Sequence, residues 1–204
     1  KIAMKAFPMI AKHLKGNMIS LGFKFLPEFW ATITGGVPKL VLLAEFTADS
    51  VEEALAKAYN AQAGIQGFDI SARVIPTAEE AEKYWVVRHE SFNVLRQRVK
   101  GMRTVPFIDD TIVKPEDLPQ FLPRLYAILD AYPRLTYTIA GHMGDANFHI
   151  IPLVDMHESH TKEMIFEVLQ KVDALVREFH GSYTAEHNDG LLRTPYLEEM
   201  FGPE

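Results

Sequence analysis

The sequence predicts an α+β fold, a largely antiparallel sheet with helices packed on one face. Apolar residues recur along the chain with periods of about 2 and about 3.6, which mark strands and amphipathic helices in alternation. Two strand-like segments, residues 135–140 and 147–154, are joined by a short glycine-rich connection, which favours an antiparallel pair over a doubly wound parallel sheet. The chain has 204 residues, 48% of them hydrophobic, enough for one domain with a buried core. We expect one domain over residues 1–204, with the weakest pattern in residues 1–39.

Two strands are expected in the N-terminal half. Residues 40–46 form a short continuous apolar run, as a buried strand does. Residues 68–75 alternate between apolar and polar side chains, as a half-buried strand does. Residues 1–36 show no firm period, and two glycines close them.

Two capping boxes predict where the helices of this half begin. Ser50 with Glu53 starts a helix that runs toward Gly64, and Thr77 with Glu80 starts a second one. The second helix carries an apolar stripe. Its members are Ala78, Ala81, Trp85, Phe92, Leu95 and Val99.

The C-terminal half adds further elements in a regular order. Residues 107–113 read as a strand, and Pro115 suits the first turn of a helix that ends near Pro133. The last long helix is expected over residues 159–180, and Gly181 stops it.

Composition excludes several classes of protein. The net charge is −6 without Lys/Arg clusters, which argues against nucleic-acid binding. The chain has no cysteine, which excludes disulfides, thiolate zinc sites and iron–sulfur ligands within it. No apolar run approaches the roughly 20 residues that span a bilayer, and no signal-peptide pattern opens the chain. We expect a cytoplasmic protein, and peripheral attachment at the inner membrane face stays open.

Both ends predict a fragment of a longer protein. The chain starts at Lys1 without a methionine, and it stops at Glu204 without a capped closing element. Exposed hydrophobic surface is expected where a neighbouring domain belongs.

The densest chemical signal is Gly-His-Met-Gly-Asp-Ala-Asn-Phe-His at residues 141–149. Glycines and an aspartate predict a hairpin turn. Because side chains alternate along a strand, Asn147 and His149 share one face and Phe148 takes the other, toward the core. Histidine is a common metal ligand and acid–base catalyst, so His142 and His149 are candidate site residues. A surface histidine bonded to backbone is the plainer alternative.

A second signal, Glu-His-Asn-Asp-Gly, follows the last helix stop at residues 186–190. Glu186 with His142 and His149 would form a set of two histidines and one carboxylate, which suits zinc, manganese or ferrous iron and leaves positions open. His187 could act as a base beside it. A polar turn is the alternative, since Asn-Asp-Gly forms one readily.

Arg88 is a third candidate, because it is the one charge within the apolar stripe of its helix. A buried guanidinium needs a partner, and the carboxylate of a substrate fits its planar fork. An ion pair with Asp109 or Asp110 is the alternative.

These stretches together resemble the C-terminal domain of FAD-linked oxidases. Residues 141–149 resemble the family's Gly-His-x-Gly-Asp-Gly-Asn-x-His signature, and residues 186–197 resemble its second signature, which begins Glu-His-Gly and continues through Arg-x-Pro. Residues 107–113 resemble its Glu-Asp-Val-x-Val strand, and residues 85–88 resemble the helix that carries a substrate arginine. The match runs in order from residue 40 to 204. The Glu-His-Asn-Asp-Gly-Leu-x-Arg-Thr-Pro form resembles the branch that is fused to an iron–sulfur part.

The resemblance implies a ferredoxin-like cap domain of a vanillyl-alcohol-oxidase-type flavoprotein, similar to D-lactate dehydrogenase and the glycolate oxidase flavoprotein subunit. A separate N-terminal domain would hold FAD, and the cap would help oxidise a small D-2-hydroxy acid by hydride transfer to the flavin. An iron–sulfur domain or subunit is a further possible partner.

The resemblance also implies roles for individual residues. A divalent metal would be held by residues that match the family's ligands, namely His142, His149 and Glu186. Arg88 would bind the substrate carboxylate, and His187 would accept the hydroxyl proton. Asn147 would help to orient the substrate or the edge of the cofactor, and Asn147 and Asn188 would contribute to cofactor binding.

Three positions depart from the family pattern. Ala146 and Asn188 replace glycines, which puts the backbone geometry there in question. Ile108 stands where the hydroxyglutarate enzyme has a lysine, which favours a monocarboxylate such as lactate or glycolate.

Two other interpretations of the function remain open. One is a self-contained metal hydrolase that uses His142, His149 and Glu186, and the other is a non-catalytic ferredoxin-like module that binds a small anion.

Overall fold

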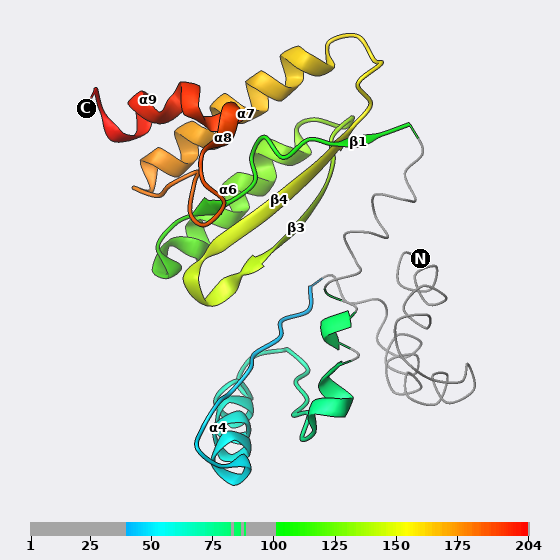
Figure 1. The fold of residues 1–204 in the computed structure, drawn as a ribbon, viewed down its shortest axis with the longest axis vertical. Helices are drawn as coiled ribbons and strands as arrows, with labels where there is room; N and C mark the ends of the chain where they lie inside the picture. The colour runs from blue at the N-terminus through cyan, green and yellow to red at the C-terminus, as the bar shows by residue number, and fades with distance from the viewer. Residues whose placement is uncertain (1–39, 83, 87, 89–100, 204) are drawn as a thin grey trace. The chain divides into compact units, whose positions relative to one another are not determined.

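The computed structural model describes residues 40–82, 84–86, 88 and 101–203, and the chain divides into two compact units (Figure 1). The N-terminal unit is Lys1–Arg98 and the C-terminal unit is Val99–Glu204. Among the described residues, no helix is long and apolar enough to cross a membrane.

The N-terminal unit confirms both capping boxes. Helix α4 covers Val51–Gly64, and the Ser50 hydroxyl accepts the Glu53 amide at 3.2 Å. Residues 78–82 are helical, and the Thr77 hydroxyl accepts the Glu80 amide at 3.2 Å. Residues 92–99, which form the end of the expected apolar stripe, lie outside the described residues.

The two strands expected in this unit do not form. Residues 40–46 and 68–75 have no regular secondary structure, and most of their large apolar side chains are exposed, Leu40 by 63% and Ile70 by 59%. Apolar alternation records only which side chains prefer burial, whereas a strand also needs a neighbour for its backbone hydrogen bonds. Within the described part of this unit neither segment has such a neighbour.

The C-terminal unit contains the antiparallel sheet that the sequence predicts. Strand β4 (Asn147–Val154) is central and pairs with β3 (Thr136–His142) along one edge. Strands β1 (Arg103–Thr104) and β2 (Thr111–Ile112) pair with opposite ends of its other edge. The α+β class is therefore confirmed.

The strand expected over residues 107–113 is much shorter than predicted. Only Thr111–Ile112 pairs with β4, although Phe107 and Ile108 are buried in the core. The backbone turns at Asp110, whose φ of 71° lies in the left-handed region and interrupts an extended ladder.

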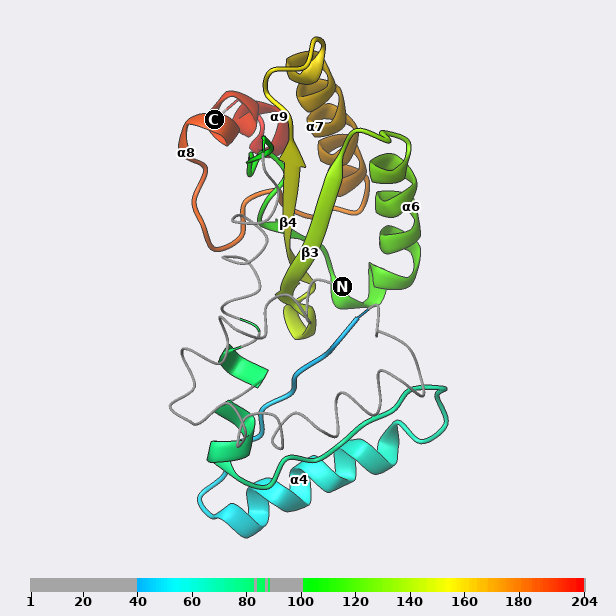
Figure 2. The ribbon, with the colours of Figure 1, turned by 90° about the vertical axis from the view of Figure 1, so that its right-hand side faces the viewer.

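Two long helices cover one face of this sheet (Figure 2). Helix α6 (Leu118–Asp130) follows the 3₁₀ turn η1 (Pro115–Asp117), and α7 (Thr161–Glu178) follows β4, both close to the expected bounds. Three short elements close the chain: α8 (Gly190–Arg193), η3 (Thr194–Tyr196) and α9 (Leu197–Phe201).

The core lies between these two helices and β4. It is built from Phe121, Leu125 and Leu129 of α6, Val168, Leu169, Val172, Leu175 and Val176 of α7, and Phe148, Ile150 and Val154 of β4. This packing anchors β4 by one face, and at the start of the strand the other face carries Asn147 and His149.

Phe121 tests that anchor. It is fully buried, and its ring centroid lies 6.4 Å from that of Phe148 and 5.5 Å from that of Phe179. We expect Phe121→Ala to lower the free energy of unfolding by about 3–5 kcal/mol, because it removes the ring and leaves a cavity. Urea titration followed by circular dichroism measures this. Phe166→Ala, at a site that is 56% exposed, is the control and should change it by about 0.5 kcal/mol or less. Equal losses in both variants would contradict this description of the core.

Candidate active site

The turn between β3 and β4 fixes the first pair of site residues. Gly141 has φ 150°, and a Cβ there would lie 2.1 Å from the Asn147 carbonyl oxygen, so only glycine fits. His142 and Asn147 then pair across the hairpin. The 3₁₀ turn η2 (Met143–Asp145) joins them and ends at Ala146, which is left-handed with φ 53°.

The two departures from the family's glycines share one explanation. Ala146 with φ 53° and Asn188 with φ 62° both adopt the left-handed conformation that glycine takes most easily. Asparagine tolerates it well, and Ala146 is held in it by complete burial. The backbone geometry that the sequence put in question is therefore present at both positions.

Strand β4 presents its polar residues on the face away from the helices. Phe148 and Ile150 are buried in the core at 2% and 0% exposure, whereas the His149 side chain is 15% exposed on the other face. The expectation that Phe148 and His149 take opposite faces is confirmed.

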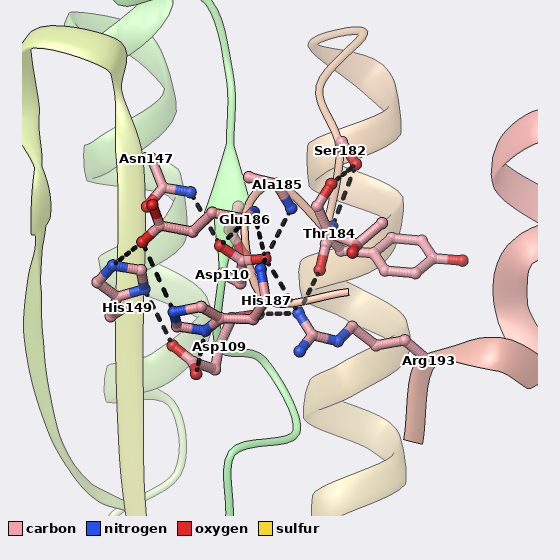
Figure 3. A network of polar contacts seen from close by, with 12 residues as sticks. Asp109, Asp110, Asn147, His149, Ser182, Thr184, Ala185, Glu186, His187 and Arg193 are labelled. Atoms are coloured by element: carbon pink, nitrogen blue, oxygen red, sulfur yellow. Dashed lines mark hydrogen bonds and ion pairs between the residues drawn. The ribbon is translucent and has the colours of Figure 1, made fainter. Parts of the chain in front are cut away.

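A buried carboxylate, Asp110, holds the second signature against this face (Figure 3). It accepts hydrogen bonds from the backbone amides of Ala185 at 2.7 Å, Glu186 at 2.9 Å and His187 at 2.9 Å. Asn147 Nδ2 donates to it at 3.1 Å. The two signatures therefore meet at Asp110.

Electrostatics agree with this arrangement. Burial raises the pKa of Asp110, but the hydrogen bonds that it accepts, first the one from the His187 amide, outweigh burial and hold the pKa below its usual value. Arg193 Nη1 lies 3.5 Å from the carboxylate and adds a compensating charge. Asp110 is therefore ionised at neutral pH.

Glu186 Oε1 is the point where three imidazoles converge. It lies 2.9 Å from His149 Nε2, 3.2 Å from His142 Nε2 and 3.6 Å from His187 Nε2. The structure thus brings together the histidine pair, the glutamate and the adjacent histidine that the sequence selected. The side chains of His142, Glu186 and His187 are 43–46% exposed, so the cluster opens to solvent.

Asp109 supports two of these rings from behind. Its Oδ2 lies 3.2 Å from His187 Nδ1, and its Oδ1 lies 3.4 Å from His149 Nδ1. Asp109 Oδ1 and His149 Nδ1 are both buried, and neither forms a hydrogen bond with the other or with any other described residue. A carboxylate bonded to the far ring nitrogen is the usual support of a metal-ligating histidine, and among these two contacts only the one between Asp109 and His187 Nδ1 is such a hydrogen bond.

The donor set fits a divalent metal. His142 Nε2 and His149 Nε2 each lie within hydrogen-bond distance of Glu186 Oε1, and the group is open on one side. The described side chains whose ligand atoms all lie within 4.8 Å of one another are Asp110, His149, Glu186 and His187; this tighter group shares His149 and Glu186 with the expected set but does not include His142. Asp110 is a poor ligand, however, because four N–H groups already occupy its carboxylate.

The other expected site residues are placed differently. Arg88 lies in the N-terminal unit and is exposed rather than buried in an apolar stripe, with its guanidinium carbon 5.8 Å from the centroid of the Trp85 ring. Its carboxylate-binding role stays a prediction. The Asn147 amide is 4% exposed and engaged by Asp110, whereas Asn188 is exposed, and their cofactor roles also stay predictions.

Sequence reasoning considered Asp109 and Asp110 only as partners for Arg88, and missed their place in this site. A usable signal was present, because two successive carboxylates directly follow the apolar pair Phe107 and Ile108. In such a segment one carboxylate must turn inward, where it requires hydrogen-bond donors.

The fold and the site define a metal-compatible, histidine-rich α+β domain, and comparison with known proteins identifies its family. Residues 6–204 match the family described as FAD linked oxidases, C-terminal domain. The chain belongs to this family.

Several relatives are D-2-hydroxy-acid dehydrogenases by name. The chain is 30% identical over 167 residues to D-2-hydroxyglutarate dehydrogenase of Pseudomonas putida, a match that covers 78% of this chain and 16% of the relative. It is 26% identical over 203 residues to D-lactate dehydrogenase of Archaeoglobus fulgidus, which covers 98% of this chain and 41% of the relative. The chain therefore spans less than half the length of these relatives.

Proposed function

We propose that this chain is the substrate-side domain of an FAD-dependent dehydrogenase that oxidises a D-2-hydroxy acid. The observation that carries the proposal is the meeting of three imidazoles at Glu186 Oε1, within a chain of the FAD-linked oxidase family. An anion-binding module has no need of such a cluster. A self-contained hydrolase could use it, but the family argues for a flavin-linked oxidation.

The substrate class follows from what the relatives share. D-lactate and D-2-hydroxyglutarate both carry a hydroxyl group on the carbon next to a carboxylate, and relatives are named for each of them. The sequence favoured a lactate- or glycolate-like monocarboxylate on the basis of Ile108. That residue is buried in the core at 2% exposure, so its side chain gives no structural support to a choice between the two.

We assign His142, His149 and Glu186 as the residues that would hold a divalent cation such as zinc, manganese or ferrous iron. A cation at this position would polarise the substrate hydroxyl and lower its pKa. His149 Nδ1 lies 3.4 Å from Asp109 Oδ1, and Nε2 of the same ring is the nitrogen beside Glu186.

His187 is the proposed acceptor of the hydroxyl proton. Its Nδ1 faces Asp109 at 3.2 Å, which leaves Nε2 on the open side of the cluster, beside Glu186. An imidazole so oriented can take a proton from a bound hydroxyl at neutral pH. Arg88 would bind the substrate carboxylate through its planar fork.

The flavin would receive the hydride, and we propose that a part of the whole protein other than this chain holds most of it. Asn147 and Asn188 are the chain's proposed contributors near the cofactor. An iron–sulfur domain or subunit as electron acceptor, and attachment to a membrane face, stay predictions.

Metal titration tests the ligand assignment. We expect the metal-stripped chain to bind about one equivalent of zinc or manganese, because three donors already converge in it. His142→Ala and Glu186→Ala should each weaken binding by more than about tenfold, since each removes a ligand. Isothermal titration calorimetry measures both. His157→Ala, at an exposed histidine outside the cluster, is the control and should bind as the parent does. Binding that persists in Glu186→Ala would refute the assignment.

Kinetics of the whole protein test the roles of His187 and Arg88. We expect His187→Gln to slow flavin reduction by a D-2-hydroxy acid by about a hundredfold to ten-thousandfold, because the proton acceptor is lost. Arg88→Lys should chiefly raise KM, because one ammonium group cannot replace the planar fork. Stopped-flow absorbance of the flavin, with D- and L-lactate and D- and L-2-hydroxyglutarate, measures both effects and the substrate preference. His157→Gln serves as the control. Full-rate reduction in His187→Gln would rule out its assigned role.

A further inference from the structure

Asp110 is the most completely engaged polar side chain of the described residues at the site. Its carboxylate is 0% exposed and accepts N–H groups from three consecutive residues, Ala185, Glu186 and His187. These amides belong to residues 75 to 77 positions further along the chain. The contact therefore joins two distant segments at one point.

We propose that Asp110 is a positioning residue, which orients Glu186 and His187 by holding the backbone amides of Ala185–His187. The inference rests on the proposed function, since those two side chains are its proposed metal ligand and proton acceptor. Asp110 itself touches neither substrate nor metal, because its oxygens are already taken up by N–H donors.

The local backbone shows why such an anchor is needed. Residues 183–189 form no helix or strand, so their amides have no regular partners. Amides that point away from water must still be paired. Successive N–H groups that point to one side form a concave nest that suits an anion, and the Asp110 carboxylate fills it.

Neighbouring side chains hold the anchor in place. Asn147 Nδ2 donates to Asp110 at 3.1 Å and ties it to the start of β4. Arg193 Nη1 donates to the carbonyl oxygens of Asp109 at 3.0 Å and Tyr183 at 3.1 Å, and so links the same two segments beside the carboxylate. The Asp110 carboxylate and the backbone of Ala185–His187 are therefore both held in place. This fixes the backbone from which the side chains of Glu186 and His187 extend.

The test replaces Asp110 by asparagine in the full chain and follows two readouts. The first is amide hydrogen exchange at residues 185–187, measured by NMR. The second is titration with cobalt(II) alone, followed by its visible absorption, which reports both affinity and coordination geometry. Asp173→Asn is the matched control, because Asp173 is a similarly buried carboxylate at 3% exposure that pairs with Arg177 on α7.

We expect Asp110→Asn to speed exchange at the three amides by about tenfold or more, while α7 amides and the unfolding temperature change little. Cobalt affinity should fall by about tenfold to a hundredfold, as for other residues that support metal ligands, with a changed absorption band. Asp173→Asn should leave both readouts as in the parent. Parent-like exchange and a parent-like spectrum in Asp110→Asn would overturn the proposal.

The two readouts separate this proposal from the proposed function. If the parent chain binds no cobalt, the metal assignment fails, and the exchange data alone decide the role of Asp110. If Asp110→Asn does not fold, Asn147→Leu takes its place, since it removes one donor but keeps the carboxylate. Faster exchange at residues 185–187 would then support the anchor, and unchanged exchange would refute it.

Discussion

The site depends on one buried interaction, the carboxylate of Asp110 held by three consecutive backbone amides. A charge with no exposed surface is tolerated only when donors surround it, and here those donors are the backbone of the segment that carries Glu186 and His187. The same contact thus stabilises the charge and places two reactive side chains. Without it, an irregular segment would have to keep its position beside β4 by weaker contacts.

The remaining structure supplies a rigid side and an open side around this contact. Helices α6 and α7 pack on one face of the sheet and fix β4, so His149 and Asn147 project from a firm base. The opposite side is open, with His142 and Glu186 both nearly half exposed. A site that admits a ligand needs this combination of rigid support and access.

Much of this could be predicted from sequence, and the failures have physical causes. The hairpin and its two histidines follow from glycine placement and strand alternation, and the capped helices follow from local patterns. Strands at residues 40–46 and 68–75 were wrongly expected, because apolar pattern does not report whether a pairing neighbour exists. Asp110 was missed, because the local pattern indicates only that one carboxylate of the pair turns inward, whereas its hydrogen-bond donors are amides far along the chain. Of the residues selected from motifs, the structure brings His142, His149, Glu186 and His187 into one cluster.

The central claim is that a metal binds between the two signatures, through His142, His149 and Glu186. A crystal of the whole chain grown with zinc, with anomalous diffraction recorded above and below the zinc edge, tests it most directly. The account predicts one strong anomalous peak within about 2.0–2.3 Å of His142 Nε2, His149 Nε2 and a Glu186 oxygen. A peak elsewhere, a peak coordinated by Asp110 instead of His142, or no peak in zinc-saturated crystals would contradict it.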